Sequence, residues 1–175
     1  NRYSLLKRTK QYMEVEVDGK VHKVEILGVV EFNSTRKRMS VVVRMNEDGK
    51  SKIRVFCKGA DNIMMARLDK TKNNAGVLQK ASDALIEFSN IGLRTLVIGY
   101  RELSDTEFSR FKKNWDAAEI SLSANREELL DAASDLIETD MSLLGCTAIA
   151  DKLQDKVPET IVNLLLSGIK MWLLT

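Results

Sequence analysis

Polar and hydrophobic residues alternate along the first third of the chain, which is typical of strands with one buried face. The alternation is regular over Tyr12–Val17, and the Asp18-Gly19 pair that follows favours a tight hairpin turn. Similar patterns predict three further strands, at Val21–Phe32, Arg38–Arg44 and Ile53–Lys58. We therefore expect the first half of the chain to form an antiparallel sheet built mainly of hairpins.

The spacing of apolar residues changes to that of helices after residue 60. A short helix is predicted over 61–68, and a longer helix before Gly92 has apolar residues at Val77, Leu78, Ala81, Leu85 and Phe88. After an apolar strand at 94–100, the sequence Ser104-Asp105-Thr106-Glu107 is a capping box that opens a third helix, and a fourth is predicted over about 125–138. The fold class predicted is α+β, an antiparallel β-sheet flanked by helices.

The last 30 or so residues differ from the rest of the chain. An extended segment is predicted at Leu144–Ala150, and Pro158 suits the first turn of a helix that runs to about Ser167. Ile169–Leu174 is then almost entirely apolar, and a helix followed by such a strand is typical of a parallel sheet covered on both faces. We expect a first domain at 1–143 and the start of a second domain at 144–175, so that the chain is part of a longer protein.

Composition and charge narrow the class of protein. The chain has 175 residues, 44% of them hydrophobic and 30% charged, which suits a globular protein, and no run of about 18 apolar residues predicts a membrane span. Residues 1–75 carry 17 Lys and Arg against 9 Asp and Glu, whereas residues 76–175 carry 10 against 16. The basic first half favours an anionic partner. Cys57, Cys146 and His22 fit no zinc-ligand spacing, and the two cysteines are expected to be small buried hydrophobes.

Candidate chemistry is densest where the second predicted strand ends. Phe32 is followed by hydroxyl and amide side chains and then by three cations at 36–38, which together offer a stacking face beside positive charge. This combination suits a planar base that carries phosphates. The alternative is a charged hairpin edge with Phe32 in the core. The three cations are expected to form a solvated cationic rim, and Asn33 and Ser34 either bind the ligand or bond their own backbone.

Two other positions have side chains suited to an anionic ligand. Lys58 ends a strand and supplies a compact charge, while Gly59 allows close approach of the backbone to a ligand because it has no Cβ. Arg94 follows a helix-ending glycine, and its planar guanidinium suits phosphate oxygens. The alternative for Arg94 is a salt bridge to Glu31 or Asp61.

Four segments in order, "EFNSTRKRMSV", "CKGAD", "GLRTL" and "DKLQDKVPETI", together resemble the nucleotide-binding (N) domain of a P-type ATPase. Their wording is most similar to the type IV subgroup, the phospholipid flippases. The resemblance implies an N-domain fold followed by a C-terminal fragment of an α/β phosphorylation domain. It also implies an ATP site and a hinge. The implied ATP-binding residues are Phe32, Lys58, Arg94 and Thr175, with Ser34 and Gly59 as weaker candidates, and the implied hinge residues are Asp151 and Asp155.

The resemblance further implies what the chain does within a larger protein. The aspartate that accepts phosphate in the family lies outside this sequence, so the chain is expected to bind ATP without hydrolysing it, with Mg²⁺ held in the full-length protein. The parent is expected to be an integral membrane enzyme, with this domain on the cytosolic side. It would move a phospholipid through membrane helices beyond this chain, with an accessory subunit as a further expected partner and without nucleic acid. The alternatives are a basic-face interaction module and the N domain of a cation-transporting relative.

Overall fold

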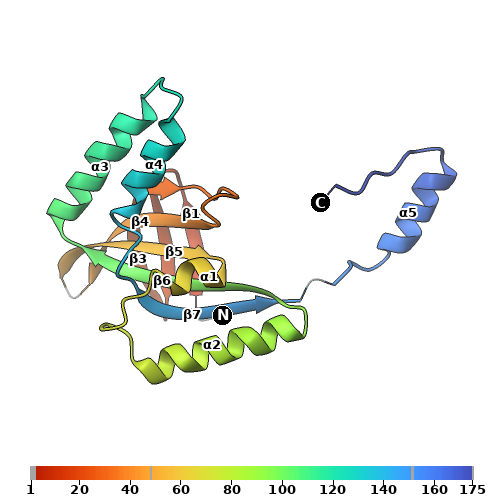
Figure 1. Ribbon diagram of the computed structural model, residues 1–175, viewed down its shortest axis with the longest axis horizontal. Coiled ribbons are helices and arrows are strands. Elements are labelled where there is room, and N and C mark those ends of the chain that lie inside the picture. The colour runs from red at the N-terminus through yellow and green to blue at the C-terminus, as the bar shows by residue number, and fades with distance from the viewer. Residues whose placement is uncertain (1–2, 48, 151, 175) are drawn as a thin grey trace.

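The computed structural model describes residues 3–47, 49–150 and 152–174. These residues contain one seven-stranded sheet in which every strand pairs antiparallel with the next strand in the chain (Figure 1). The strands are β1 (Tyr3–Arg8), β2 (Tyr12–Val17), β3 (Lys20–Val30), β4 (Arg38–Glu47), β5 (Lys50–Gly59), β6 (Arg94–Leu103) and β7 (Ser142–Ile149). The turn between β2 and β3 has positive φ at both Asp18 and Gly19, as a tight hairpin turn requires.

Five helices are present among the described residues, and two pairs of them connect the last three strands. The helices are α1 (Asp61–Met65), α2 (Ala75–Asn90), α3 (Asp105–Glu119), α4 (Arg126–Asp135) and α5 (Val157–Leu166). Ser104 and Glu107 form the predicted capping box at the start of α3. Gly92 has φ +76° just after α2, so its predicted role at the end of that helix is confirmed.

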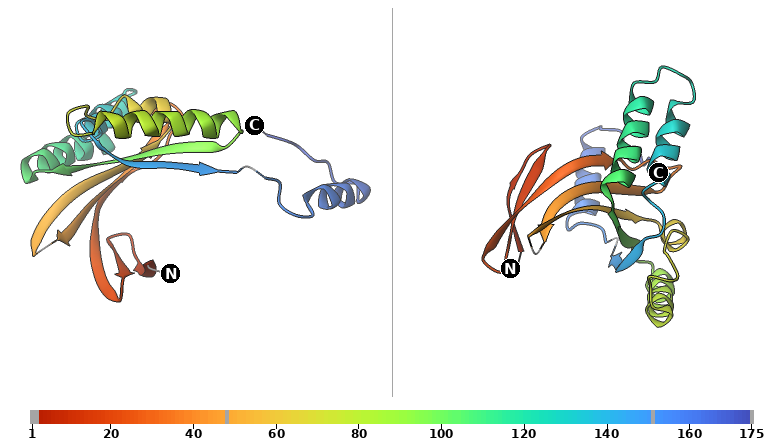
Figure 2. Two further views of the ribbon diagram at one scale, coloured as in Figure 1. Left: turned by 90° about the horizontal axis from the view of Figure 1, so that it is seen from below. Right: turned by 90° about the vertical axis from the view of Figure 1, so that its left-hand side faces the viewer.

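Helices α1 to α4 cover one face of the sheet, and the core lies between (Figure 2). Alternate residues of β4, β5 and β6 supply the buried layer, which includes the fully buried Val42, Val55 and Val97. Met64, Phe111 and Ile137 contribute from the helical side, each with at most 2% of its surface exposed. Burying each such side chain contributes about 1.5–3 kcal/mol. The predicted α+β class, with a sheet flanked by helices, is confirmed.

Two local predictions differ from the structure. Strand β1 was not predicted, although it pairs with β2 at the edge of the sheet. The strand predicted at Ile169–Leu174 is wrong, because these residues form no strand and Trp172 and Leu173 are 81% and 91% exposed. An apolar strand of this kind needs a neighbour on each side to pair with its backbone, and the described part of the chain supplies none.

The C-terminal segment extends away from the sheet and carries α5 (Figure 1). The helix predicted from Pro158 is confirmed as α5, which has proline in its first turn. The predicted domain boundary after residue 143 falls inside β7, where Leu143 pairs with Gly99 of β6. Within the described residues no helix is both long and apolar enough to cross a membrane.

Candidate functional site

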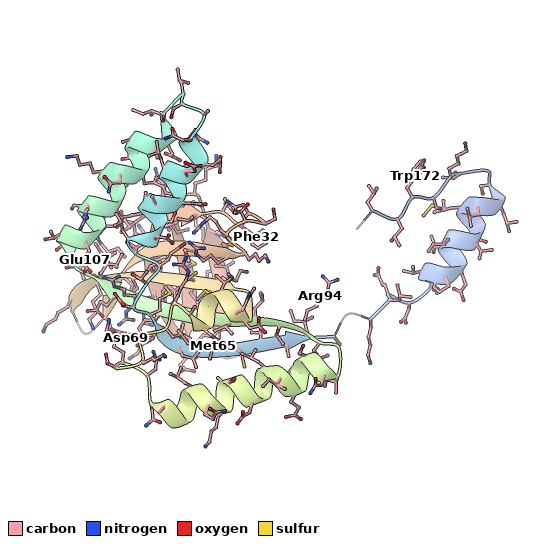
Figure 3. All side chains as sticks on the ribbon, viewed as in Figure 1. Phe32, Met65, Asp69, Arg94, Glu107 and Trp172 are labelled. Carbon is pink, nitrogen blue, oxygen red and sulfur yellow. The ribbon has the colours of Figure 1, made fainter. Side chains whose placement is uncertain are left out.

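The three strongest site candidates lie at one end of the sheet. Strand β3 ends at Val30 beside Ser40 of β4, and the next position of β4, Met39, pairs with Lys58 of β5. Lys58 in turn pairs with Ile98 of β6. The end of β3 thus lies about two strand spacings, or about 10 Å, from β5, and Phe32 comes two residues after it. Arg94 begins β6 at the same end of the sheet, and Figure 3 labels it together with Phe32.

Phe32 is not a core residue. Its side chain is 61% exposed, so the alternative that places this ring in the interior is wrong. The ring lines a hollow of about 300 Å³ between the β3–β4 connection and helices α3 and α4. Four carboxylates line this hollow against two guanidinium groups, those of Arg36 and Arg126, and this excess of negative charge disfavours phosphate there. An exposed ring at the end of a strand is available for stacking.

The connection from Glu31 to Lys37, which we call the aromatic turn, is fixed by its own hydrogen bonds. The Arg36 amide donates to Asn33 Oδ1 at 2.7 Å, and the Lys37 amide donates to the Asn33 carbonyl at 2.9 Å. The Ala60 amide donates to the Lys37 carbonyl at 3.0 Å. Asn33 therefore bonds its own backbone, which was one of its two predicted roles. Ser34 is exposed beside it.

Lys58 lines a second hollow of about 320 Å³ on the sheet face opposite the helical core. This hollow is mainly apolar, with walls that include Val29, Met39, Val41, Phe56 and Ile98. Val29, near the end of β3, lines both this hollow and the Phe32 hollow. Lys58 itself is exposed. An ammonium group beside an apolar recess is suited to a flat, partly polar ring with an anionic tail.

Arg94 lies on the same sheet face as Lys58. It stands four residues before Ile98, and Ile98 pairs directly with Lys58, so the alternation of side chains places Arg94 on that face. Arg94 is exposed and lies about 13 Å along β6 from Ile98 at the usual strand rise. The structure thus places Lys58, the apolar hollow and Arg94 in sequence along one face.

The structure gives a reason for glycine at position 59 that differs from the predicted one, and the implied place of Gly59 in the ATP site stays a prediction. A Cβ built on Gly59 would lie 2.7 Å from both the Arg38 Cβ and the Lys37 carbonyl oxygen, too close for any side chain. Glycine is required here because the end of β5 packs directly on the aromatic turn. The close approach is to the chain's own backbone and needs no ligand to explain it.

The predicted cationic rim is wrong for two of its three members. Arg36 and Arg38 are only 4% and 5% exposed. Arg36 Nη2 donates to both carboxylate oxygens of Glu138 at 2.5 Å, and Arg38 Nε donates to Glu138 Oε2 at 2.6 Å. The Ser40 hydroxyl donates to Glu138 Oε1 at 2.6 Å. Only Lys37 is exposed as predicted.

The Glu138 cluster, defined by Arg36, Arg38, Ser40 and Glu138, is a buried site that sequence reasoning missed. Burial alone would raise the pKa of Glu138, but hydrogen bonds from Arg36 and Ser40, together with the guanidinium charges, outweigh it and hold the pKa below its usual value. Two acids of α4 contact the rim of the cluster, Asp131 at 3.1 Å from Arg36 and Asp135 at 2.7 Å from Arg38. The signal that was missed is the alternation along β4. Arg38 and Ser40 stand four and two positions before buried Val42, so they belong to the same buried face of the strand.

Burial also makes Cys57 a structural residue. It is 1% exposed, and burial raises the pKa of its thiol to about 11 despite the opposing hydrogen bond with Ser40. Its expected role as a buried hydrophobe is confirmed, whereas Cys146 is only partly buried. The described residues contain no group of three or more His, Cys, Asp and Glu side chains placed to hold a metal ion.

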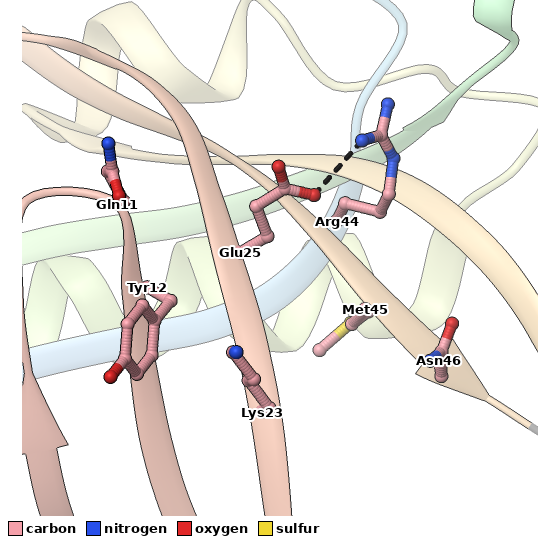
Figure 4. Close-up of a pocket in the computed structure, with 7 residues that line it drawn as sticks. All are labelled: Gln11, Tyr12, Lys23, Glu25, Arg44, Met45 and Asn46. Atoms are coloured by element: carbon pink, nitrogen blue, oxygen red, sulfur yellow. Dashed lines mark hydrogen bonds and ion pairs between the residues drawn. The ribbon is translucent and has the colours of Figure 1, made fainter.

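Another surface hollow is a weaker candidate for ligand binding (Figure 4). It measures about 370 Å³ and lies across β2, β3 and β4. Its one aromatic ring, Tyr12, is covered by Lys23 at 4.4 Å from the ring centre, and Arg44 is paired with Glu25 at 3.0 Å. Because its ring and these cations already have partners, this hollow offers less to a stacked anion than the Lys58 hollow does.

The remaining predicted residues are in or beside the C-terminal segment. Asp155 is exposed in the turn that precedes α5. Asp151 and Thr175 lie outside the described residues. Their implied roles, as hinge residues and as part of the ATP site, stay predictions.

A comparison with family models and a comparison with individual proteins agree with each other. The family described as "P-type ATPase, cytoplasmic domain N" matches residues 3–156. The chain is 43% identical over 176 residues to the phospholipid-transporting ATPase DNF2 of Saccharomyces cerevisiae, covering 99% of this chain and 11% of that protein. It is 47% identical over 157 residues to phospholipid-transporting ATPase 10 of Arabidopsis thaliana, covering 89% of this chain and 13% of that protein. It is 42% identical over 173 residues to phospholipid-transporting ATPase IC of Homo sapiens, covering 99% of this chain and 13% of that protein.

Proposed function

The chain belongs to the P-type ATPases, as a cytoplasmic N domain, and on this premise we propose that it binds ATP at the sheet end that carries Phe32, Lys58 and Arg94. In the proposed arrangement the adenine ring lies in the Lys58 hollow with Phe32 at its edge, and the phosphates extend toward Arg94. The observation that carries the proposal is the position of Lys58 beside an apolar hollow, with Arg94 on the same face.

Each side chain supplies a different part of the interaction. Stacking of a base on an aromatic ring contributes about 1–3 kcal/mol in nucleic-acid complexes. Lys58 contributes a point charge, and Arg94 can bind two phosphate oxygens at once. The site is open to solvent and has no enclosing phosphate loop, so we expect a dissociation constant on the order of 0.1–1 mM, or about 4–5.5 kcal/mol.

The chain spans 11–13% of the length of these relatives, so the activity of the whole protein is inferred. The three relatives are named as phospholipid-transporting ATPases. We propose that the parent protein uses ATP bound here to phosphorylate an aspartate outside this chain, with Mg²⁺ bound at that distant site. The resulting cycle would drive a phospholipid toward the cytoplasmic leaflet, with an accessory subunit as a further proposed partner.

The C-terminal segment has a proposed role of its own. We propose that the residues after β7 lead into the phosphorylation domain, with Asp151 and Asp155 in the hinge and Thr175 near the phosphates of ATP. The exposed apolar side chains of Trp172, Leu173 and Leu174 support this assignment, because they would be buried if that domain were completed. This chain alone is expected to bind ATP without hydrolysing it.

Titration of ATP into the 175-residue chain, followed by NMR, tests the proposal. Phe32→Ala and Lys58→Ala should each weaken ATP binding about fivefold or more. Tyr3→Ala and Lys20→Ala are matched controls. Tyr3 is 63% exposed and Lys20 is exposed, and both lie at the end of the sheet opposite to the proposed ATP site. The site assignment is wrong if the first pair binds ATP as the unmodified chain does, or if the control pair weakens binding equally.

A further inference from the structure

The Arg36 side chain joins the aromatic turn to the helical layer. Arg36 Nη2 donates to both oxygens of Glu138, which follows α4 and is fully buried. The same guanidinium reaches back through Nη1 to the carbonyl of Glu31 at 3.3 Å. Glu31 immediately precedes Phe32, so a single planar group connects the helical layer to the backbone that carries the exposed ring.

The geometry makes Glu138 the fixed end of this connection. Its carboxylate is held by three donors, from Arg36, Arg38 and Ser40, and the latter two belong to β4. Arg36 Nη2 contacts both carboxylate oxygens while Nη1 contacts the Glu31 carbonyl, and these charge-assisted bonds together fix the position of the Arg36 guanidinium. The hydrogen bond from the Arg36 backbone amide to Asn33 Oδ1 then holds the turn in place relative to Arg36.

The exposure of Phe32 makes such a connection useful. The ring is 61% exposed, so packing around it contributes little to fixing its place. A binding group that is already held in its bound position loses less conformational freedom when the ligand arrives. Arg36 donates to the backbone carbonyl of Glu31 and to the side-chain oxygen of Asn33, the residues on either side of Phe32.

We propose that Arg36, oriented by Glu138, is a positioning residue that holds Phe32 in place for base stacking. The inference rests on the proposed ATP site and deepens it. Arg36 acts without touching the nucleotide, since its guanidinium is 4% exposed and turned toward Glu138.

A double-mutant cycle tests this role. Arg36→Met in the 175-residue chain should weaken ATP binding about fivefold, and it should add little to the loss in a chain that already carries Phe32→Ala. Arg36→Lys keeps the charge and should restore part of the affinity. Arg67→Met is the matched control, because Arg67 contacts Asp135 and the Glu138 carbonyl without a bond to the aromatic turn.

Hydrogen exchange gives a readout that is independent of nucleotide. Arg36→Met should increase exchange at the Lys37 amide, which donates to Asn33 in the turn, while Arg67→Met should leave that rate unchanged. An equal loss of affinity with and without Phe32→Ala would overturn the inference, as would unchanged exchange at Lys37. If Phe32→Ala weakens ATP binding and Arg36→Met does not, the positioning role fails and the proposed function stands. If the unmodified chain binds no ATP, the proposed function itself fails.

Discussion

Replacing Glu138 by Gln tests whether the Glu138 cluster is held together by charge. The substitution keeps the size of the side chain but leaves two guanidinium groups, each about 5% exposed, without their shared carboxylate. Removing one partner from a buried ion pair costs about 3–5 kcal/mol. Asp131 and Asp135 still face the two arginines from α4, at 35% and 52% exposure, so the lower end of that range applies.

We therefore expect Glu138→Gln to lower the free energy of unfolding by about 3 kcal/mol, a large part of the 5–15 kcal/mol typical of a domain. Urea unfolding followed by circular dichroism measures this change. Glu25→Gln is the matched control, because Glu25 pairs with Arg44 on the surface, with side chains 52% and 38% exposed. An exposed pair contributes about 0–1 kcal/mol. Equal destabilisation by the two substitutions would refute the reasoning.

The dependence of this effect on pH follows from the direction of the pKa shift. Hydrogen bonds and the charges of Arg36 and Arg38 hold the pKa of Glu138 below its usual value, despite burial. The stabilisation is therefore present above the unfolded pKa of about 4.3 and is lost as pH falls through the lower folded value. Asp131, Asp135 and Arg67 also face the cluster, so Glu138→Gln should remove only part of the acid destabilisation.

Three further predictions address packing, thiol reactivity and binding. Gly59→Ala should lower the free energy of unfolding, measured by urea unfolding, by about 1–3 kcal/mol, because the added Cβ would lie 2.7 Å from atoms of Arg38 and Lys37. Gly28→Ala is the control, because a Cβ there meets nothing within 4 Å, and equal costs for the two substitutions would contradict this account. An alkylating reagent at pH 8 should modify Cys146 well before Cys57, whose pKa burial raises to about 11; mass spectrometry that found Cys57 modified first would contradict it. ATP binding should persist in part at 0.5 M salt, because stacking is not screened, whereas complete loss would indicate docking through the basic face alone.

The sequence predicted the sheet and most helix boundaries because those depend on local patterns. The strand at Tyr12–Val17, the Asp18-Gly19 turn and the capping box at Ser104 each depend on a few neighbouring residues, and all three are present in the structure, although burial does not alternate along that strand. Local sequence also placed Phe32 near the end of a strand, but it left open whether the ring lies in the core, and the structure shows that the ring is 61% exposed.

What the sequence did not predict depends on distant partners. Arg36 and Arg38 resemble solvated cations until Glu138, about 100 residues later, is placed against them. Gly59 resembles a ligand-facing glycine until the aromatic turn packs on it. The apolar run 169–174 was predicted to be a strand from its composition, but a strand forms only when another segment pairs with its backbone.

The central claim is that adenine binds at the sheet end between Phe32 and the Lys58 hollow. An isotope-filtered NOE experiment on the 175-residue chain with ATP measures which side-chain protons approach the base. We predict contacts from the adenine protons to the Phe32 ring and to the methyl groups of Met39 and Ile98. Contacts to Tyr12 and Met45 in the hollow across β2, β3 and β4, with none to Phe32, would contradict the account.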